Sequence, residues 1–450
     1  MQAILSEKLK KTAFSLSAPL YIVGGATRDF LAGLSSARAD IDLASPVSTD
    51  EFLSAAEKNG FKAVAVYKNT GTVKLTDGMG EDYEFTRFRS DKYIRGEHRP
   101  FEILFTDDIR LDARRRDFTA NAVYYDIAAN EFVDPLGGIA DIQAKRLETV
   151  DEPEKVFGED GLRLMRLARQ AGQTGFTPTE ACLAGATANA KLILDIVPER
   201  IYAELCSCLT ADEKYGNQNG HYRALKILER IGVLEILFPD LAKGKNLAQR
   251  PDFHDHDVLE HSLRAVLYAH PSVRLAALFH DIGKPFCFYR DGHSHDHPQE
   301  GERLTRSILN ALKAPKKTVE ETATLVRLHM YDFDGKTKES KLRRFFVEHA
   351  PTLEKLTLLK QADYSGCKDD LTLCPTNAKW TGILEKMKAE GAPLTLKDLK
   401  IKGNELLALG IPPNKIATLL KELLLLAVNQ PTLNDNGRLK KLCLARLHQK

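Results

Sequence analysis

The stretch YIVGGATRDFLAG (residues 21–33) decides the fold of the first part of this chain. It begins as a short apolar run, reaches Gly24 and Gly25, and continues into a helix predicted to start near Thr27. A strand that turns through glycines into a helix lets backbone N–H groups approach a ligand, at the helix end that favours anions. Arg28 adds a fixed positive charge. The pattern therefore predicts a phosphate-binding turn between a strand and a helix.

Two carboxylates follow within ADIDLAS (residues 39–45). This segment alternates like a strand, so Asp40 and Asp42 are expected on the same face. Because two like charges repel at this spacing, they need a counter-ion, and Mg²⁺ suits hard oxygen ligands. Carboxylates, metal and phosphate turn together indicate in-line phosphoryl transfer of the two-metal type. A solvated turn would explain Asp-x-Asp alone, but the glycine turn upstream favours the site. Glu84 is a candidate third carboxylate, although an alternating edge strand explains it equally well.

The composition is that of a soluble globular protein, with 450 residues, 43% hydrophobic and 28% charged. This length favours two to four domains at roughly 100–200 residues each. No apolar run approaches the ~20 residues of a membrane span, and the N-terminus lacks the features of a signal peptide. The seven cysteines are odd in number and include no C-x-x-C pair, which argues against a disulfide framework and a cysteine zinc site. A reducing cytoplasm fits best.

The chain changes character after DPLGG (residues 134–138). Before it, alternating or short apolar segments predict strands, and a helix is expected over residues 48–60. The predicted strands are PLYIVGG, ADIDLAS, FKAVAVY, TVKLT, YEFTRF and FEILF. From about residue 139 helical periodicity dominates to the end of the sequence. The predicted fold class is α+β, with a small mixed-sheet head followed by an elongated all-α body.

Five motifs in a fixed order over about 190 residues carry a family resemblance. They are GGATRD with DID, RRRDFTANAVYYD (114–126), DPLGG with DI (134–142), FGEDGLRLMRLARQAGQTGF (157–176) and VPERIYAELCSCL (197–209). The first resembles the signature of polymerase-β-like nucleotidyltransferases. The set resembles class II tRNA nucleotidyltransferases, or CCA-adding enzymes, and their bacterial poly(A) polymerase relatives. This resemblance implies a polymerase-β-like head that adds CMP and AMP, from CTP and ATP, to the 3′ end of tRNA.

The resemblance also assigns roles to individual residues. The implied catalytic residues are Asp40, Asp42 and Arg28, with Mg²⁺ held by the two aspartates. The implied triphosphate cradle is Gly24, Gly25 and Arg28. The residues implied around the sugar and phosphates are Arg115, Arg116, Asp117 and Asn121. Asp117 is expected to address the ribose 2′-OH.

Glu159, Asp160 and Arg163 match the family's Glu-Asp-x-x-Arg element. On one helix Asp160 and Arg163 would be i,i+3 neighbours that address one object, while Glu159 braces Arg163. Cytosine and adenine present an amino donor beside a ring-nitrogen acceptor, whereas uracil and guanine present the inverse order. An acceptor beside a donor therefore matches C and A, and a buried mismatch costs about a few kcal/mol. These three residues are predicted to select the base.

The rest of the same helix is expected to be structural. Arg166 is counted among the nucleotide-binding residues, but it and Arg169 are expected on an RNA-facing or solvated side rather than in the base reader. The predicted core stripe is Leu164, Leu167, Ala168 and Ala171.

One departure from the family pattern lies in RFRSDKYIRGEHRPFEILF (residues 87–105), where the family has a flexible loop. Tyr93, Arg99 and Pro100 fit that loop, but IRGEH replaces its usual acidic residue. Because the loop is implicated in the change from C to A addition, a poly(A) polymerase or a CC-only or A-only enzyme stays an alternative.

Histidines are concentrated in the helical part, and His280-Asp281 lies in an apolar segment that ends at a glycine and a proline. This pair resembles the core of the HD phosphohydrolase superfamily. The candidate metal ligands are His261, His280, Asp281, His297, His329 and Asp363, a set suited to Mn²⁺, Fe²⁺, Co²⁺, Ni²⁺ or Zn²⁺. The loop histidines 254, 256, 293 and 295 are expected to be solvated or to bind only transiently. The resemblance implies hydrolysis of phosphate esters on RNA or nucleotide ends, with a purely structural domain as the alternative. In a further alternative, the HD domain is the enzyme and the head only binds RNA.

The expected partners are the tRNA 3′ end, CTP and ATP, with no membrane and no obligate protein partner. Contacts to the tRNA backbone, a salt-dependent and sequence-neutral interaction, are expected from Arg200, Lys402, Lys415, Arg438 and Lys440. The predicted domains are a catalytic head (1–138), a base-recognition neck (139–197), a tRNA-binding body (198–250), an HD domain (251–366) and a tRNA-binding tail (367–450).

Overall fold

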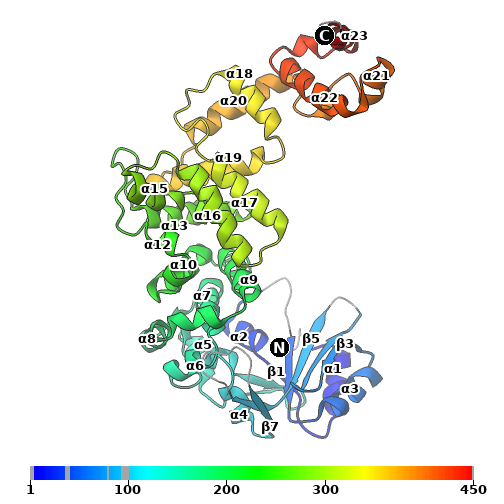
Figure 1. The fold of residues 1–450 in the computed structure, drawn as a ribbon. Coiled ribbons are helices and arrows are strands. Elements are labelled where there is room, and N and C mark those ends of the chain that lie inside the picture. Colours follow the sequence, from blue (N-terminus) through cyan, green and yellow to red (C-terminus); the bar gives the residue numbers. More distant parts are fainter. Residues whose placement is uncertain (1–4, 36–40, 79–80, 93–100, 448–450) are drawn as a thin grey trace. The chain divides into compact units, whose positions relative to one another are not determined.

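The structure is a computed structural model that describes residues 5–35, 41–78, 81–92 and 101–447 (Figure 1). It divides into two compact units, residues 1–242 with 311–314, and residues 243–310 with 315–450. The sheet lies in the first unit, and the described part of the second unit is helical. The predicted α+β fold, with a mixed-sheet head followed by a helical body, is confirmed.

A mixed seven-stranded sheet forms the head, in the order β3-β4-β5-β2-β1-β8-β9. Its strands are β1 (Tyr21–Val23), β2 (Ile41–Ser45), β3 (Lys62–Tyr67), β4 (Thr72–Thr76), β5 (Asp82–Arg87), β8 (Tyr124–Asp126) and β9 (Glu131–Val133). Only β2 and β5 pair in parallel within it. Two small pairs stand apart from this sheet: β6 (Arg89–Lys92) with β7 (Glu102–Phe105), and β10 (Arg146–Leu147) with β11 (Thr177–Pro178). The sequence did not predict β6, β8, β9, β10 or β11.

The central strands bury both faces, because successive side chains point to opposite sides. Ile22 and Leu43 join a core beneath α1 (Glu7–Phe14) and α3 (Thr49–Lys58), where Phe52 stacks on Phe85 with ring centroids 3.8 Å apart. Val23 and Ala44, one residue further along, join a second core with Phe88 and Tyr124. Alternation along β2 therefore places Asp42 on the face opposite to Leu43.

The remaining helices of the first unit run from the end of β1 to residue 242. They are α2 (Gly25–Ala32), α4 (Ile109–Arg114), α5 (Gly138–Gln143), α6 (Pro153–Glu159), α7 (Leu162–Thr174), α8 (Glu180–Ala188), α9 (Pro198–Leu209), α10 (Gly220–Arg230), α11 (Val233–Leu237) and α12 (Pro239–Ala242), with short 3₁₀ turns η2 (Thr119–Asn121) and η3 (Ala190–Asp195). The predicted core stripe of α7 is confirmed, since all four of its side chains are fully buried.

The helix predicted through residues 158–170 is wrong at one point, because α6 ends at Glu159 and α7 begins at Leu162. The break has a local cause. Asp160 leaves the helical conformation, and its Oδ1 accepts a hydrogen bond of 2.9 Å from the Leu162 N–H, as a capping side chain does. Gly161 then passes so close to η3 that a Cβ there would lie 2.3 Å from the Leu192 carbonyl oxygen.

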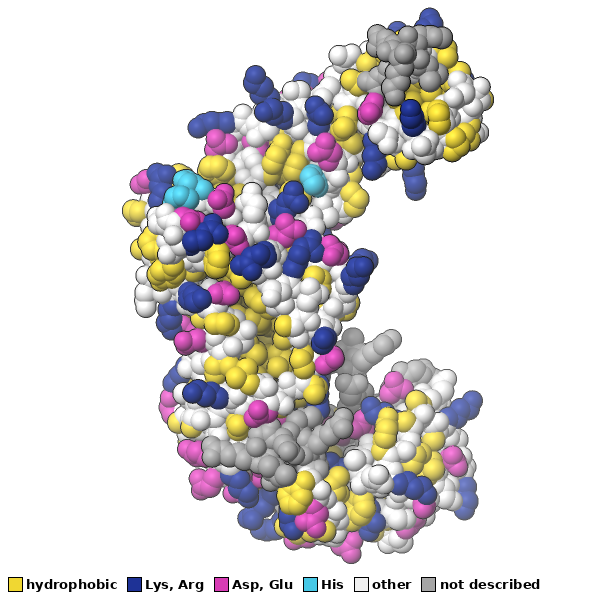
Figure 2. All heavy atoms as spheres, in the orientation of Figure 1, with side chains coloured by type: hydrophobic (Ala, Val, Ile, Leu, Met, Phe, Trp, Pro, Cys, Tyr) yellow, Lys and Arg dark blue, Asp and Glu magenta, His cyan; other side chains and the backbone are white. Residues whose placement is uncertain are grey.

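The second unit consists of helices α13 to α23. They are α13 (Val258–Tyr268), α14 (Arg274–Phe279), α15 (Gly283–Asp291), α16 (His297–Ala311), α17 (Lys316–Leu328), α18 (Glu339–Glu348), α19 (Leu353–Lys368), α20 (Pro375–Ala389), α21 (Gly403–Ala408), α22 (Pro413–Ala427) and α23 (Asn436–Leu447). Helix α13 packs against α14 and α19. Figure 2 shows basic and acidic side chains interspersed on the visible surface, in keeping with the net charge of +2. Among the described residues, no helix is long and apolar enough to cross a membrane.

Candidate functional site

A cavity of about 1070 Å³ in the first unit collects most of the predicted nucleotide-site residues. Those that line it are Gly24, Gly25, Arg28, Asp42, Glu84, Arg115, Arg116, Asp117, Asn121, Asp160, Arg163, Arg166 and Arg200. Asp40, Tyr93, Arg99 and Pro100 lie outside the described residues. Gly24 and Arg200, which are 176 positions apart in the sequence, thus share one concave surface.

The turn after β1 and the carboxylate of β2 fit closely together. Gly24 has φ +81°, in the region that favours glycine, and a Cβ there would lie 2.6 Å from Asp42 Oδ2. Glu84 is the register partner of Asp42 on the neighbouring parallel strand, so the two side chains share a face. The Lys74 ammonium lies 3.1 Å from Glu84 Oε2. The backbone turn, Asp42 and Glu84 therefore stand side by side along the cavity wall.

Arg28 is buried, and its guanidinium makes five hydrogen bonds to protein groups. Nε and Nη2 both donate to Asp29 Oδ1, and Nη2 also donates to the Tyr215 hydroxyl at 3.1 Å. Nη1 donates to Asn121 Oδ1 at 2.9 Å and to Gln170 Oε1 at 3.2 Å. A guanidinium has five N–H donors, so a phosphate contact would have to displace one of these acceptors. Arg28 holds the wall of the cavity together in this structure.

Asp117 is the second hub of this wall. Its Oδ2 accepts from Arg166 Nε at 2.9 Å and Nη2 at 2.6 Å, and from Gln170 Nε2 at 3.1 Å. Its Oδ1 accepts from Asn121 Nδ2 and from the backbone N–H of Phe118, each at 2.9 Å. Although burial opposes ionisation, Arg166 and Asn121 hold the pKa of Asp117 well below its usual range. A ribose hydroxyl would have to replace one of these donors to reach this carboxylate.

Arg115 and Arg116 converge on Asp112, which the sequence analysis did not single out. Arg115 Nε donates to Asp112 Oδ1 at 2.7 Å, and Arg116 Nη2 donates to Oδ2 at 3.2 Å. The Tyr124 hydroxyl also donates to Oδ2, at 2.6 Å. Burial opposes the charge on Asp112, but the two guanidinium groups lower its pKa from 3.8 to about 2. Asp112 thus holds both arginines of the Arg-Arg-Asp motif, Arg115 and Arg116, through ion pairs.

We expect this carboxylate to contribute to stability in a pH-dependent way. Because its pKa is lower in the folded chain, its contribution is present above about pH 4 and is lost as the pH falls toward 2, a change of about 2 kcal/mol. Asp112→Asn leaves two buried guanidinium groups without their anion and should destabilise the fold by about 3 kcal/mol at neutral pH. Thermal unfolding by circular dichroism should show this gap shrinking on acidification. A gap that is constant from neutral pH to pH 3 would contradict the assignment.

The base-selection residues adopt a different geometry from the one expected. Arg163 Nη1 donates to Glu159 Oε2 at 2.9 Å and to the Val156 carbonyl oxygen at 2.8 Å, while Nη2 donates to the Arg115 carbonyl oxygen at 2.8 Å. Glu159 therefore braces Arg163, as the spacing indicated. Asp160 and Arg163 both line the cavity. They stand on two sides of a helix break, however, and not on one continuous helix.

Two arginines of α7 differ in their partners. Arg166 was expected on a solvated or RNA-facing side. Instead it lines the cavity and forms an ion pair with the buried carboxylate of Asp117. Arg169 Nε donates to Glu204 Oε2 at 2.7 Å. Gln170, which sequence reasoning missed, lies four residues after Arg166 and joins Arg28, Asp117 and Asn121 in one network. Its spacing from Arg163 and Arg166 was the signal that could have found it.

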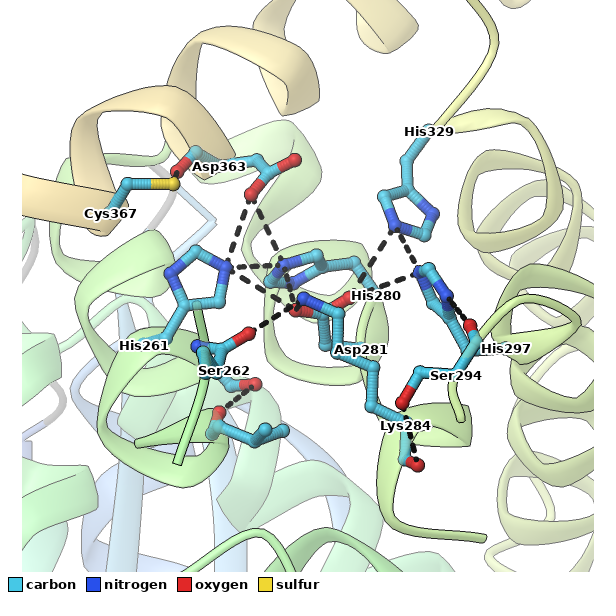
Figure 3. Close-up of polar contacts among 12 residues, drawn as sticks. His261, Ser262, His280, Asp281, Lys284, Ser294, His297, His329, Asp363 and Cys367 are labelled. Carbon is cyan, nitrogen blue, oxygen red and sulfur yellow. Dashed lines mark hydrogen bonds and ion pairs between the residues drawn. The ribbon is translucent and has the colours of Figure 1, made fainter. Parts of the chain in front are cut away.

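All six predicted HD residues come together in the second unit (Figure 3). The Nε2 atoms of His261 and His280 lie 3.0 Å apart, and those of His297 and His329 lie 3.2 Å apart. Asp363 Oδ1 lies 3.1 Å from His261 Nε2. Asp281 stands between the pairs, with Oδ2 3.3 Å from His280 Nε2 and Oδ1 3.3 Å from His297 Nε2. Lys284, which the sequence did not flag, places its ammonium 2.6 Å from Asp281 Oδ2.

The donor set of this cluster fits metal ions. His280, His297 and His329 each direct Nδ1 at the carbonyl oxygen three residues earlier, at 2.6–2.7 Å. A neutral imidazole that donates from Nδ1 presents a lone pair at Nε2, so facing Nε2 atoms need a positive charge between them. Burial lowers the pKa of His329 to about 4, which keeps it neutral. Burial acts the same way on His280, but Asp281 and Asp363 outweigh it and raise its pKa to about 10. Positive charge is thus favoured here.

The loop histidines behave differently from one another. His293 and His295 are exposed, as expected. The expectation of a solvated residue is wrong for His254, whose Nδ1 is buried and whose ring packs edge-on against His261 with centroids 4.7 Å apart. His256 is half-buried, with Nε2 3.8 Å from Asp369 Oδ2. His254 therefore belongs to the edge of the HD cluster.

The predicted RNA-binding residues are dispersed. Arg200 lines the nucleotide cavity. In the tail, Lys415 is exposed, whereas the Lys402 ammonium donates to the Lys397 and Leu399 carbonyl oxygens. Lys440 pairs with Glu405 at 2.9 Å, and Arg438 Nη1 donates to the Thr432 carbonyl oxygen at 2.8 Å. Three of the four predicted tail residues thus have partners within the tail itself.

Comparison with known proteins gives a match to a segment of each unit. A family model described as "Poly A polymerase head domain" matches residues 20–148, and one described as "HD domain" matches residues 258–365. An A-adding tRNA nucleotidyltransferase of Deinococcus radiodurans is 32% identical over 359 residues, which cover 76% of this chain and 75% of that protein. A CCA-adding enzyme of Levilactobacillus brevis is 33% identical over 261 residues, 57% of this chain and 58% of that protein.

Solved structures share the fold. The CCA-adding enzyme of Bacillus stearothermophilus, in complex with CTP, aligns over 99% of both chains with a TM-score of 0.67 and 22% identity. The CCA-adding enzyme of Thermotoga maritima, complexed with tRNA-CCA, aligns over 98% of this chain and 94% of that one, with a TM-score of 0.62 and 17% identity. The sheet head and the helical body are thus a known arrangement of elements.

Proposed function

The chain belongs to the tRNA nucleotidyltransferase family that includes A-adding and CCA-adding enzymes, and we therefore propose that it transfers CMP and AMP, from CTP and ATP, to the 3′ end of tRNA. The observation that carries the proposal is Asp42, which is held against the Gly24 turn at the wall of a cavity with several arginines. In the reaction the tRNA 3′-hydroxyl attacks the α-phosphate of the bound nucleotide, and pyrophosphate leaves.

The residues of the cavity supply the positioning for this transfer. Asp42, together with Asp40, would hold Mg²⁺, which neutralises the charge that develops on the phosphates. Arg115 and Arg116, held in place by Asp112, present positive charge to the phosphates. The hydrogen-bond network of Arg28, Asp117 and Gln170 holds these three lining side chains in place. The contribution of this chain is thus a preorganised electrostatic site.

A nucleotide-addition assay tests the proposal. The full chain is incubated with CTP and ATP, one of which is labelled, and with one of three tRNAs. These tRNAs end before CCA, after the first C, or after CC. We expect CCA to be completed on each and extension to stop there. Incorporation of a single A on the CC-ending tRNA alone would instead identify an A-adding enzyme, which is the activity in the name of the similar Deinococcus radiodurans protein. A long A tail would indicate a poly(A) polymerase. Absence of incorporation with retained tRNA binding would overturn the proposal and favour the HD domain as the enzyme.

Base selection gives a second, sharper test. We expect Arg163→Ala and Asp160→Ala to lower the preference for CTP and ATP over UTP and GTP by about 10–100-fold, because each removes one half of a hydrogen-bonding pair. The measurement is the ratio of kcat/KM between correct and incorrect nucleotides. Arg169→Ala is the matched control, since Arg169 pairs with Glu204 and is not assigned to the reader. Unchanged ratios in both reader variants would show that the base is selected elsewhere.

For the second unit we propose metal-dependent hydrolysis of phosphate esters at RNA or nucleotide ends. The support is the convergence of four imidazoles and two carboxylates of the HD type. The metal would be held by these six residues and would supply a polarised, activated water. Lys284 keeps Asp281 ionised and oriented through their 2.6 Å ion pair. Turnover of a 2′,3′-cyclic phosphate in the presence of different divalent metals tests this role.

A further inference from the structure

His261 differs from the other three histidines of the HD cluster. In those three, Nδ1 faces the carbonyl oxygen three residues earlier. For His261 the equivalent carbonyl is that of Val258, and it accepts a hydrogen bond of 2.9 Å from the Ser262 hydroxyl instead. His261 is 0% exposed, and no described residue forms a hydrogen bond with its Nδ1. A buried ring nitrogen without a partner is costly and calls for an explanation.

Two further side chains that can bind a metal ion lie next to His261. One donor atom each of His254, His261 and Cys367 lies within 4.8 Å of the other two. Figure 3 shows the Cys367 sulfur beyond the ring edge of His261 that points away from Asp281. His254 Nδ1 is also buried, without a hydrogen-bond partner among the described residues. Two imidazoles and a thiol therefore lie within reach of one ion, and two of these three side chains, His254 and Cys367, are not among the six HD residues.

The backbone fixes this arrangement. Asp255, the neighbour of His254, donates its N–H to the Cys367 carbonyl oxygen at 3.0 Å. The Lys368 ammonium reaches the Pro251 carbonyl oxygen at 3.3 Å. The segment before α13 is thereby attached to the C-terminal turn of α19, which carries Cys367. Donor atoms from three segments are thus held together by bonds outside the group itself.

We propose that His254, His261 and Cys367 form a second metal site, for a thiophilic divalent ion such as Zn²⁺, adjoining the HD cluster and sharing His261 with it. Two imidazoles and one thiolate are a common Zn²⁺ donor set, and three protein ligands leave a fourth position for water. When both sites are loaded, His261 bridges them, with Nε2 on the HD side and Nδ1 on the thiolate side. Binding releases the thiol proton and the remaining ring proton of His261 to solvent.

This site is separate from the proposed nucleotide addition. All three ligands lie in the second unit, whereas the nucleotide cavity lies in the first. It is also distinct from the HD set, in which every ligand is an imidazole or a carboxylate. The chain has no C-x-x-C motif. The site therefore depends on folding, which brings His261 and His254 to Cys367 from 106 and 113 positions away in the sequence.

Cobalt spectroscopy of the full chain tests the proposal, because thiolate ligation of Co²⁺ gives a charge-transfer band in the near ultraviolet that imidazoles and carboxylates do not give. Metal-free protein is titrated with CoCl₂. We expect the thiolate band to reach a plateau whose intensity corresponds to one thiolate-bound Co²⁺ per chain, and added Zn²⁺ to abolish it. Cys367→Ser should lose the band completely while the visible Co²⁺ bands of the HD cluster remain. His254→Ala should weaken Co²⁺ binding at this site at least tenfold.

The controls separate ligation from folding. Cys206→Ser alters another half-buried free cysteine, in the first unit, and should leave the band unchanged. Circular dichroism of Cys367→Ser checks folding, and its serine hydroxyl can still donate to the Asp363 carbonyl oxygen as the thiol does. A wild-type chain that binds Co²⁺ without a thiolate band would overturn the proposal. So would a band that persists in Cys367→Ser. Neither outcome bears on nucleotide addition, which is assayed separately.

Discussion

Replacing Asp42 with asparagine is expected to reduce the rate of nucleotide addition by about a thousandfold or more. An amide carries no charge to balance a metal ion or the phosphates, and metal-ion catalysis of phosphoryl transfer is worth several kcal/mol. The fold should tolerate the change, because the amide has nearly the shape of the carboxylate beside Gly24. The measurement is the single-turnover rate at which labelled CTP is added to tRNA that lacks CCA, or labelled ATP to tRNA that ends in CC.

The matched control for Asp42 is Asp50→Asn. Asp50 is an exposed carboxylate of the same head that pairs with the exposed Lys68, so its loss should change the rate by less than about twofold. A comparison of CTP binding in both variants distinguishes lost chemistry from lost affinity. If Asp42→Asn retained more than a tenth of the wild-type rate, Asp42 would not be the central carboxylate of the transfer.

The second large effect is expected for Asp281→Asn in the HD cluster. Asp281 lies between both pairs of imidazoles, and its replacement should lower divalent-metal affinity by at least about 100-fold, the upper range measured for residues that only support a ligand. Hydrolysis of a 2′,3′-cyclic phosphate should fall below detection. Metal content of the purified chain and turnover with Mn²⁺, Co²⁺ or Ni²⁺ are the measurements.

Asp296→Asn, at an exposed position near the same cluster, is the control and should behave as wild type. Nucleotide addition should be unchanged in both variants, because the cavity that carries it lies in the other unit. Hydrolysis at the wild-type rate by Asp281→Asn would exclude the cluster as the hydrolytic site. Addition that fell together with hydrolysis would indicate a folding defect, which circular dichroism would show.

Short-range sequence patterns were sufficient to predict many of the helices and strands and several of the candidate site residues. Three sequence patterns reflect backbone preferences that act within a few residues. They are Gly24-Gly25 after an apolar run, the alternation of ADIDLAS, and the helical period after residue 139. The HD pair was equally readable, since His280 and Asp281 lie between the end of α14 at Phe279 and the start of α15 at Gly283. In these cases the chemistry and the local fold depend on the same residues.

What the sequence could not supply were contacts between distant segments. Gln170 and Tyr215 reach Arg28 from 142 and 187 residues away, and Tyr124 of β8 donates a hydrogen bond to Asp112, which lies in α4. The break at Asp160 depends on how closely Gly161 approaches Leu192. Cys367 appeared to be one more scattered cysteine until folding placed it beside His254. Such features arise from packing, which has no short-range signature.

The saturated guanidinium of Arg28 has a consequence for successive additions. Its five donors are occupied within the chain by acceptors from α2, η2, α7 and the segment before α10. The surface presented to an incoming nucleotide is therefore already assembled, and little conformational entropy remains to be lost there when the nucleotide arrives. This side of the cavity therefore keeps the same conformation through successive additions. Between one addition and the next, the RNA 3′ end must move back by one nucleotide, while the protein surface around Arg28 stays in place.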